Sequence, residues 1–405
     1  MRPSSSTDAE AGRRSAATLF CVFLLFGVET AYAAGLPLAV SQAGWTDPWF
    51  VSLLVALTNG VGLLMLPLFI ALIDSPLRRA LMLVSGVLMA IAAAATWISS
   101  EQGLELLLVV AVLVFGIARV AATVSLLAQL AGLRGDATLL QGLNGASQRL
   151  GSAVAIAALS SALAAGLWGL VYGVITFAML LWAAIIWMLR APSSGGSPRR
   201  WMLRDSPRVL LEALRDPRVR ASAYLNVVIL MSLLVSNSLV GLVLERRQDS
   251  AVAAVMLTAL IVARDATSVV TGLLYRRVRR RVGQQATLTL IAAAAFVSLA
   301  ILAFAPHVEG LYIPAFLLHG FIVGAGIATT NLLATHGADA GAYGARLAAS
   351  QLPAGIALLG LPLVFGVVLD LVGVTAALLA LAVAIACIGG LMLSAGAAAL
   401  NSARR

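Results

Sequence analysis

The stretch IALIDSPLRR, residues 70–79, ends one long apolar run and leads into another. GLLYRRVRRR, residues 272–281, lies in the same kind of place between two later apolar runs. Two further matches occur at nearly the same offset: ASQ at 146–148 and 349–351, and Gly116 with Gly320. Three near-equal offsets predict a duplicated chain whose halves share one architecture.

The apolar runs around these turns are too long and too many for a soluble protein. Hydrophobic residues make up 61% of the 405 residues and charged residues 11%, whereas soluble domains carry about 45–50% and about 25%. Helices of about 20 apolar residues cross a hydrocarbon core ~30 Å thick. Twelve spans are predicted: 17–40, 49–73, 79–99, 104–128, 139–164, 167–189, 220–244, 251–274, 284–305, 310–333, 346–370 and 373–396. The predicted fold class is therefore an all-α membrane protein with 12 transmembrane helices in two pseudo-symmetric six-helix bundles.

Loop charges give this arrangement an orientation. Apart from three arginines inside spans and Arg246 and Arg247 in a loop on the far side, every arginine falls on the side of both termini. By the positive-inside rule, both termini are expected in the cytoplasm and the protein in the inner (plasma) membrane. The predicted segments are an N-terminal tail (1–16), a first bundle (17–189), a cytoplasmic central loop (190–219), a second bundle (220–397) and a C-terminal tail (398–405).

The central loop contains one further predicted element, a short amphipathic helix. Ser206 is a suitable helix cap and Pro207 a suitable first residue. Val209, Leu210, Ala213 and Leu214 then fall on one face. Such a helix is expected to lie on the inner leaflet.

Arg119 stands in the middle of the span 104–128, where insertion of an ionised residue costs about 2.5–3.5 kcal/mol. It therefore requires a hydrated cavity or a carboxylate, and Glu29, at similar depth in the span 17–40, is the nearest candidate. A carboxylate that faces an arginine inside a membrane can couple its protonation to release of the arginine. The alternative is a purely structural ion pair between the two helices.

Arg264 and Asp265 form a second charged position, near the centre of the span 251–274. Neighbours on a helix point about 100° apart, so the two are not expected to make a good mutual ion pair, and at least one should find a partner elsewhere. Asp265 is a candidate second protonation site and Arg264 a candidate substrate contact, although structural packing is the alternative for both. His319 in the span 310–333 is titratable near neutral pH.

The neutral polar groups in the spans complete a candidate substrate site. Asn226 and Asn237 lie in the span 220–244 and, with His319, are the polar residues expected to contact substrate beside Glu29, Arg119 and Arg264. For the asparagines and the histidine, hydrogen bonding between helices is the structural alternative.

With two six-helix halves, cytoplasmic termini and arginine-rich turns, the sequence resembles the major facilitator superfamily. The turn signature of that family is roughly Gly-x-x-x-Asp-Arg-x-Gly-Arg-Arg, and Asp74, Arg78 and Arg79 match it here. The resemblance implies that these three residues form a conformational latch. Drug:proton antiporters of the family carry an acid in helix 1 and an arginine implicated in proton handling in helix 4, which implies proton coupling for Glu29 and Arg119.

These features predict a proton-coupled secondary transporter that exports small, largely hydrophobic organic compounds. A proton symporter that imports a small metabolite is one alternative, and a non-transporting receptor or assembly factor is another. An enzyme is not expected, because the three histidines are scattered and no HExxH, GxSxG or phosphate-binding loop occurs. No cofactor, metal or nucleic-acid partner is expected, since the net charge of +10 comes from membrane loops. A monomer in the lipid bilayer is expected, with a small molecule and protons as its ligands.

Overall fold

The computed structural model describes residues 5–45, 50, 53–54, 57–133, 135–165, 167–189, 206–236, 240, 244 and 250–402. Within these ranges the chain is helical and contains no strand. Seven of the described helices are long and apolar enough to cross a membrane, and they include α12, which holds two of the spans expected from the sequence. The all-helical fold class predicted from the sequence is confirmed.

The described chain divides into two compact units that do not follow the sequence halves throughout. Unit 1 comprises residues 1–137, 150–210 and 337–348, and unit 2 comprises residues 138–149, 211–336 and 349–405. Each unit has its own cluster of buried apolar side chains. Two helices, α7 (Ala137–Ala164) and α14 (Tyr343–Ser402), contribute one part to each unit.

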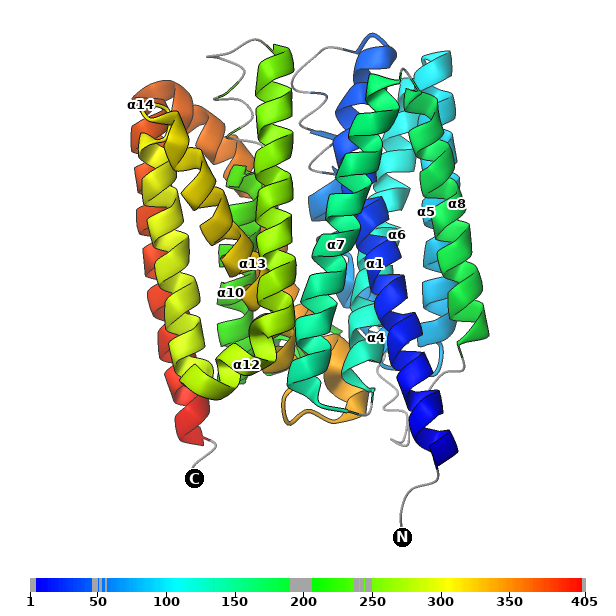
Figure 1. Ribbon diagram of the computed structural model, residues 1–405. Coiled ribbons are helices and arrows are strands. Elements are labelled where there is room, and N and C mark those ends of the chain that lie inside the picture. The colour runs from blue at the N-terminus through cyan, green and yellow to red at the C-terminus, as the bar shows by residue number, and fades with distance from the viewer. Residues whose placement is uncertain are drawn as a thin grey trace. The chain divides into compact units, whose positions relative to one another are not determined.

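Unit 1 is built from α1 (Ser5–Gln42), α5 (Arg78–Gln102), α6 (Glu105–Ala131), α8 (Trp168–Met188) and the second part of α7. Helix α5 packs against α6 and α8, and α1 packs against all three (Figure 1). Aromatic rings fill its centre: Tyr32 of α1 stacks on Phe115 of α6 with 3.6 Å between ring centroids. The Tyr32 hydroxyl is 2.8 Å from the Thr96 hydroxyl, which satisfies its polar end inside the apolar core.

The second membrane segment of unit 1 is interrupted. It consists of a π-helical stretch, η1 (Leu57–Val61), followed by α3 (Gly62–Leu64) and α4 (Leu66–Ile73). Pro67 lies in the first turn of α4, a position where its missing N–H leaves no hydrogen bond unmade. Helix α4 ends at Asp74, so the chain turns back into α5 within the IALIDSPLRR stretch.

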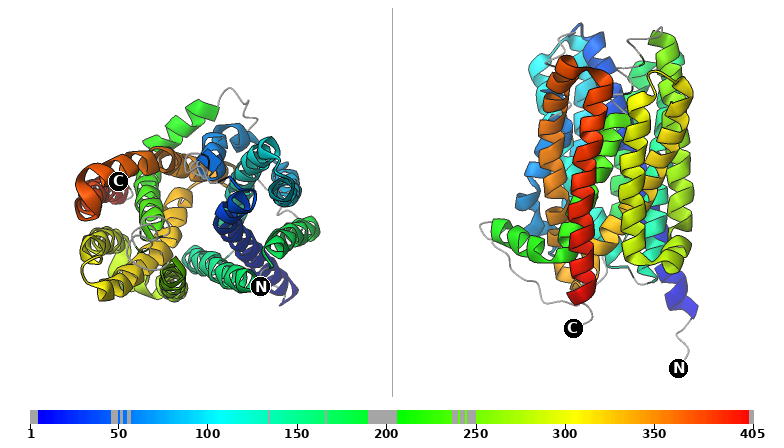
Figure 2. Two further views of the ribbon diagram at one scale, coloured as in Figure 1. Left: turned by 90° about the horizontal axis from the view of Figure 1, so that it is seen from above. Right: turned by 90° about the vertical axis from the view of Figure 1, so that its left-hand side faces the viewer.

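Unit 2 contains α10 (Pro217–Leu234), α12 (Ser250–Phe304), α13 (Tyr312–Thr335) and most of α14. Helices α12 and α14 are each two arms joined at a glycine with positive φ, Gly283 at 81° and Gly373 at 78°. Figure 2 shows α12 and α14 as folded-back pairs of arms. Only glycine adopts this backbone conformation without strain. Gly283 lies between the predicted spans 251–274 and 284–305, and Gly373 is the first residue of the predicted span 373–396.

The short helix predicted in the central loop is α9 (Ser206–Arg215). Val209 and Leu210 are buried, Ala213 and Leu214 are half-buried, and Leu211 is exposed. The apolar face predicted from the sequence is therefore present. Residues 190–205 lie outside the described part of the chain.

Glycines bring the helices of each unit unusually close, and they do so at matching positions. A Cβ placed on Gly116 of α6 would lie 2.8 Å from the carbonyl oxygens of Leu57 and Thr58 in η1. A Cβ on Gly320 of α13 would meet the Arg264 carbonyl of α12 and lie 2.7 Å from Thr267 Cβ. Small residues let membrane helices approach to backbone contact. The Gly116–Gly320 match in the sequence thus corresponds to one packing device used in both units.

The first part of α7 contributes a row of buried amides to unit 2. Asn144 Nδ2 donates to Gln141 Oε1 at 3.2 Å, and Gln148 Nε2 donates to Asn144 Oδ1 at 3.2 Å. Gly142, beside this row, packs so closely on α12 that a Cβ would lie 2.5 Å from the Gly272 carbonyl oxygen. The amides are satisfied along the helix, which allows them to be buried.

Candidate functional site

Glu29 and Arg119 form an ion pair inside unit 1. Arg119 on α6 donates through Nη1 to Glu29 Oε1 on α1. The Arg119 side chain is 9% exposed, whereas the Glu29 side chain is 23% exposed. The pairing anticipated from their similar depth is therefore formed, and its carboxylate is the more accessible partner.

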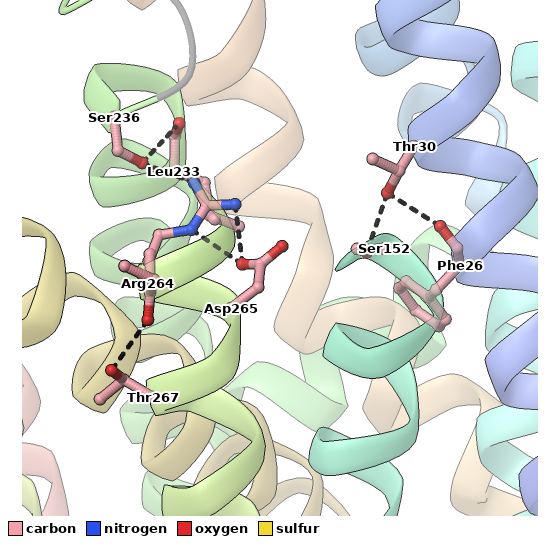
Figure 3. A network of polar contacts seen from close by, with 9 residues as sticks. Phe26, Thr30, Ser152, Leu233, Ser236, Arg264, Asp265 and Thr267 are labelled. Atoms are coloured by element: carbon pink, nitrogen blue, oxygen red, sulfur yellow. Dashed lines mark hydrogen bonds and ion pairs between the residues drawn. The ribbon is translucent and has the colours of Figure 1, made fainter. Parts of the chain in front are cut away.

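Two further contacts position this pair. Arg119 Nη2 lies 3.4 Å from the carbonyl oxygen of Thr58, which belongs to the π-helical stretch η1. π-Helical turns widen the backbone and occur often at functional sites. Next to Glu29, the Thr30 hydroxyl lies 2.8 Å from Ser152 Oγ on α7 and 2.9 Å from the Phe26 carbonyl (Figure 3). The region around Glu29 is thus formed by four elements: α1, α6, α7 and η1.

Arg264 and Asp265 are sealed inside unit 2, where their side chains are 3% and 0% exposed. Arg264 Nε donates to Asp265 Oδ1 at 2.9 Å, Nη2 lies 2.8 Å from the same oxygen, and Nη1 donates to Ser236 Oγ on the neighbouring segment at 2.8 Å (Figure 3). The expectation that these neighbours would not pair well is wrong. Their Cβ atoms diverge, but the long arginine side chain bends back to the carboxylate. The expected outside partner exists as well, in Ser236.

Of the other predicted substrate contacts, His319 adjoins Gly320, which packs on the Arg264 carbonyl, whereas Asn226 lies on α10. His319 on α13 is fully buried, and neither ring nitrogen has a hydrogen-bond partner. Asn226 on α10 donates through Nδ2 to the Ser350 carbonyl at 2.9 Å, so it already has a partner between helices. Asn237 lies outside the described residues. Asp265 Oδ2 is also buried without a hydrogen-bond partner.

Asp74, Arg78 and Arg79 form a polar cluster at the turn between α4 and α5. Asp74 Oδ1 accepts from the Gly344 backbone N–H at 2.7 Å and Oδ2 from the Ala345 N–H at 2.9 Å. Both donors belong to the first turn of α14, in the part that unit 1 includes. A carboxylate at a helix N-terminus bonds N–H groups that have no partner in the helix.

Burial opposes the charge of this carboxylate. It raises the pKa of Asp74 from 3.8 to about 6, and the two backbone hydrogen bonds and the Arg78 charge offset part of the rise. Arg78 Nη2 lies 3.7 Å from Asp74 Oδ1, and Arg78 Nε donates to the Ile73 carbonyl. Arg79 instead donates to the carbonyls of Ile186 and Trp187 and lies 5.4 Å from the centroid of the Trp187 ring. Asp74 and Arg78 therefore act together, whereas Arg79 joins α5 to α8.

Sequence reasoning missed Thr58 and Ser236, which hold the two buried arginines. Both lie in π-helical backbone: Thr58 in η1, and Ser236 in a turn that follows α10. No local sequence signal marks such a turn, because one extra residue in a helix leaves the apolar composition unchanged. In the part of the chain that the structure describes, no three His, Cys, Asp or Glu side chains gather as a metal site requires.

Comparison with known proteins places this geometry in a family. A model of the Major Facilitator Superfamily matches residues 18–357. No curated protein is significantly similar to the chain in sequence.

Similar solved structures include the transporter FucP in the outward conformation, at 17% identity and a TM-score of 0.70, with 94% of this chain and 98% of FucP covered. A variant of the E. coli fucose:proton symporter FucP gives 16% identity, a TM-score of 0.71, and coverage of 94% and 98%. The human organic anion transporter MFSD10 gives 16% identity, a TM-score of 0.73, and coverage of 94% and 99%. At these identities the likeness concerns the fold alone. Because the family model covers most of its length, the chain belongs to the Major Facilitator Superfamily.

Proposed function

We propose that this protein is a proton-coupled secondary active transporter and that Glu29 is its coupling carboxylate. The observation that carries the proposal is the Glu29–Arg119 ion pair inside the membrane segments, in which the acid is accessible and the base is buried. A purely structural pair gains nothing from an accessible carboxylate. A coupling pair requires one, since protons must reach it.

The coupling follows from the cost of charge in a membrane. While Glu29 is ionised, it neutralises Arg119, which also holds the Thr58 carbonyl. When a proton neutralises Glu29, Arg119 loses its counter-charge and must seek another acceptor, either a backbone carbonyl or a substrate. Protonation thus changes which conformation is most stable, and alternating access converts a proton gradient into substrate movement.

Export of small, largely hydrophobic organic compounds is the direction and substrate class that we favour. The buried core of unit 1 is a large cluster of apolar side chains, and an acid in the first helix is similar to that of drug:proton antiporters. A protonatable acid suits antiport, because a cationic or polar substrate competes with the proton for it. Import by proton symport is the second candidate, supported by the likeness in fold to the fucose:proton symporter.

Three further roles belong to this proposal. Asp265 is a second protonation site, because its Oδ2 atom is buried without a hydrogen bond. Arg264 and His319 contact substrate together with Asn226 when unit 2 opens. Asp74, Arg78 and Arg79 form a latch: the Asp74 carboxylate, beside Arg78, holds the first turn of α14 and releases it when the transporter changes state, while Arg79 holds α5 to α8.

The coupling role of Glu29 is tested with purified protein in proteoliposomes. A pH gradient is imposed, and flux of candidate compounds is measured for wild type, Glu29→Gln and Glu101→Gln. Glu101 is an exposed carboxylate at the end of α5, so its variant is the matched control. We expect Glu29→Gln to lose gradient-driven flux and to keep exchange between equal substrate pools, while Glu101→Gln behaves as wild type. Full gradient-driven flux in Glu29→Gln excludes Glu29 as the coupling group.

Direction is tested with the same vesicles. For an exporter, substrate accumulates on the side with the higher proton concentration, because protons and substrate move in opposite directions. For a symporter, substrate accumulates on the opposite side. Resistance of host cells to toxic compounds, present with wild type and absent with Glu29→Gln, supports export independently.

A further inference from the structure

We propose that the exposed face of the first arm of α12 that ends in Arg277 and Arg281 binds the headgroup of an anionic phospholipid. The face comprises Val270, Leu273, Leu274, Arg277 and Arg281, and we call it the α12 lipid face. Nothing in the proposed transport cycle uses it.

The side chains of the α12 lipid face share one side of the helix. Successive spacings of three or four residues place them within about 60° of one line along the helix. Val270 is 55% exposed, Leu273 54% and Leu274 44%, and both arginines are exposed. At 1.5 Å per residue, Arg277 follows Leu274 by about 5 Å and Arg281 by about 10 Å. The apolar part therefore suits an acyl chain, and the basic part meets a phosphate one helical turn further on.

The charge of this turn calls for an external anion. Five arginines occur between residues 276 and 281, and the sequence contains no acidic residue between Asp265 and Glu309. Arg279 is used internally: it lies 3.3 Å from the Tyr275 hydroxyl and donates to Gln284 Oε1 at 3.0 Å, both neutral groups. Arg277 and Arg281, four residues apart on one face, repel each other until an anion lies between them.

The equivalent turn of unit 1 is built in the opposite way. There Asp74 lies beside Arg78, and Arg79 is fixed by the carbonyls of Ile186 and Trp187. Its two arginines therefore bind groups of the protein itself. The turn of unit 2 has Arg280 and Arg281 where unit 1 has Arg78 and Arg79, and Arg276 in place of the acid, so it lacks the carboxylate that lies beside Arg78 in unit 1.

A lipid fits this face better than a free phosphate ion does. The exposed leucines adjoin the arginines on the same helix, and in a membrane they contact acyl chains whether or not a headgroup is bound. Anionic lipids attract each basic residue near the surface by about 1 kcal/mol. One molecule that carries both an acyl chain and a phosphate satisfies both parts of the α12 lipid face.

The test uses the full chain in mild detergent, with native mass spectrometry to count bound lipids. Phosphatidylglycerol and phosphatidylcholine with identical acyl chains are titrated against wild type, Arg277→Gln/Arg281→Gln and the control Arg13→Gln/Arg220→Gln. Arg13 on α1 and Arg220 on α10 are exposed arginines of other helices, so the control removes the same charge. We expect the first double variant to bind phosphatidylglycerol about 25-fold more weakly than wild type, roughly five-fold for each arginine. The control should change this affinity little.

Two results would overturn the proposal. One is equal loss of phosphatidylglycerol binding in both double variants, which assigns the effect to net charge alone. The other is displacement of the lipid by millimolar inorganic phosphate, which assigns the site to a free ion. Arg277→Lys/Arg281→Lys keeps the charge and should restore most of the binding, and its thermal midpoint should match that of wild type. Binding to phosphatidylcholine should be equal in all variants.

Discussion

Arg119 and Arg264 each offset the cost of a charge inside a membrane by pairing with a carboxylate. The two carboxylates differ in how exposed they are. Arg119 is paired with a carboxylate that is 23% exposed. Arg264 is paired with a carboxylate that is 0% exposed and with a serine hydroxyl. Access to the carboxylate from outside the protein is therefore greater at the first pair in this conformation. At the second it requires the packing of α10, α12 and α13 to open.

This difference predicts the effect of removing the sealed carboxylate. Asp265→Asn leaves the Arg264 charge buried without its counter-charge, so the free energy of unfolding should fall by about 3–5 kcal/mol. Arg264→Met/Asp265→Asn removes both charges and should be more stable than the single variant. Thermal midpoints in detergent measure both. The control is Glu10→Gln, which breaks the exposed Arg14–Glu10 pair and should cost less than about 1 kcal/mol. A double variant less stable than Asp265→Asn alone would contradict this account.

Asp74 predicts a pH dependence of stability. Its pKa is about 6 in the folded protein and 3.8 unperturbed. The folded state therefore binds more protons between these values, and stability falls as the pH rises from about 4 to about 6. The full effect is roughly 3 kcal/mol at 1.36 kcal/mol per pKa unit. Asp74→Asn should abolish this fall in the thermal midpoint, whereas Glu101→Gln should keep it. Parallel pH profiles for wild type and Asp74→Asn would contradict the prediction.

At the residue scale, depth in the membrane identified Glu29 as the nearest candidate partner of Arg119, and the structure shows the contact. A mid-span arginine needs a partner, and only one carboxylate in the first half lies at that depth. The Arg264–Asp265 pair was not predictable from helix periodicity, because periodicity fixes Cβ directions and not the path of a long side chain. The Asp74 contact with α14 joins residues 270 positions apart, and no local pattern in the sequence indicates it.

At the scale of helices, glycine contacts determine how α6 and α13 pack. Gly116 and Gly320 lie at backbone distance from η1 and α12, and Arg119 is one turn beyond Gly116. Movement of α6 along η1 therefore changes the reach of Arg119 to the Thr58 carbonyl. The contact between Gly116 and η1 therefore sets both the packing of α6 and the position of Arg119 in its ion pair.

Adding a methyl group at these glycines should disturb packing. Gly116→Ala and Gly320→Ala place a Cβ against backbone that cannot move away, so we expect each to lower the free energy of unfolding by about 1–3 kcal/mol. Gly173→Ala in α8 is the matched control, because its Cβ meets nothing within 4 Å, and it should be neutral or stabilising. Thermal midpoints in detergent measure the relative stabilities of the three variants. If Gly173→Ala were the most harmful of the three, close helix approach would not be the cause.

Helix positions followed well from apolar length, because crossing a bilayer sets the length of each run. Gly283 falls between two predicted spans and Gly373 is the first residue of the last one, and each helix breaks where its glycine has positive φ. The π-helical stretch Leu57–Val61 did not follow from the sequence. It depends on contacts with α6, and these exist only after the helices have packed.

For the whole molecule, loop arginines predict that both termini face the cytoplasm. Cysteine is introduced at exposed Gly12 or Asn401 on one predicted side and at exposed Gln102 on the other, in a background without Cys21 and Cys387. A membrane-impermeant thiol reagent added to intact cells should label Gln102→Cys only. The two terminal cysteines should react only after the membrane is opened. Labelling of Gly12→Cys in intact cells would show that the N-terminus faces the outside, which contradicts the predicted orientation.

Because α7 contributes to both units, the chain cannot be cut into two fragments that each contain one complete unit. A fragment that stops before the central loop retains residues 138–149 without the α12 and α13 surfaces that cover them. Its row of buried amides, Gln141, Asn144 and Gln148, then faces hydrocarbon or solvent. The complementary fragment has a vacancy where that row belongs. Expressed separately, the two fragments should be obligate complements, each rescued from degradation by the other and neither accumulating alone.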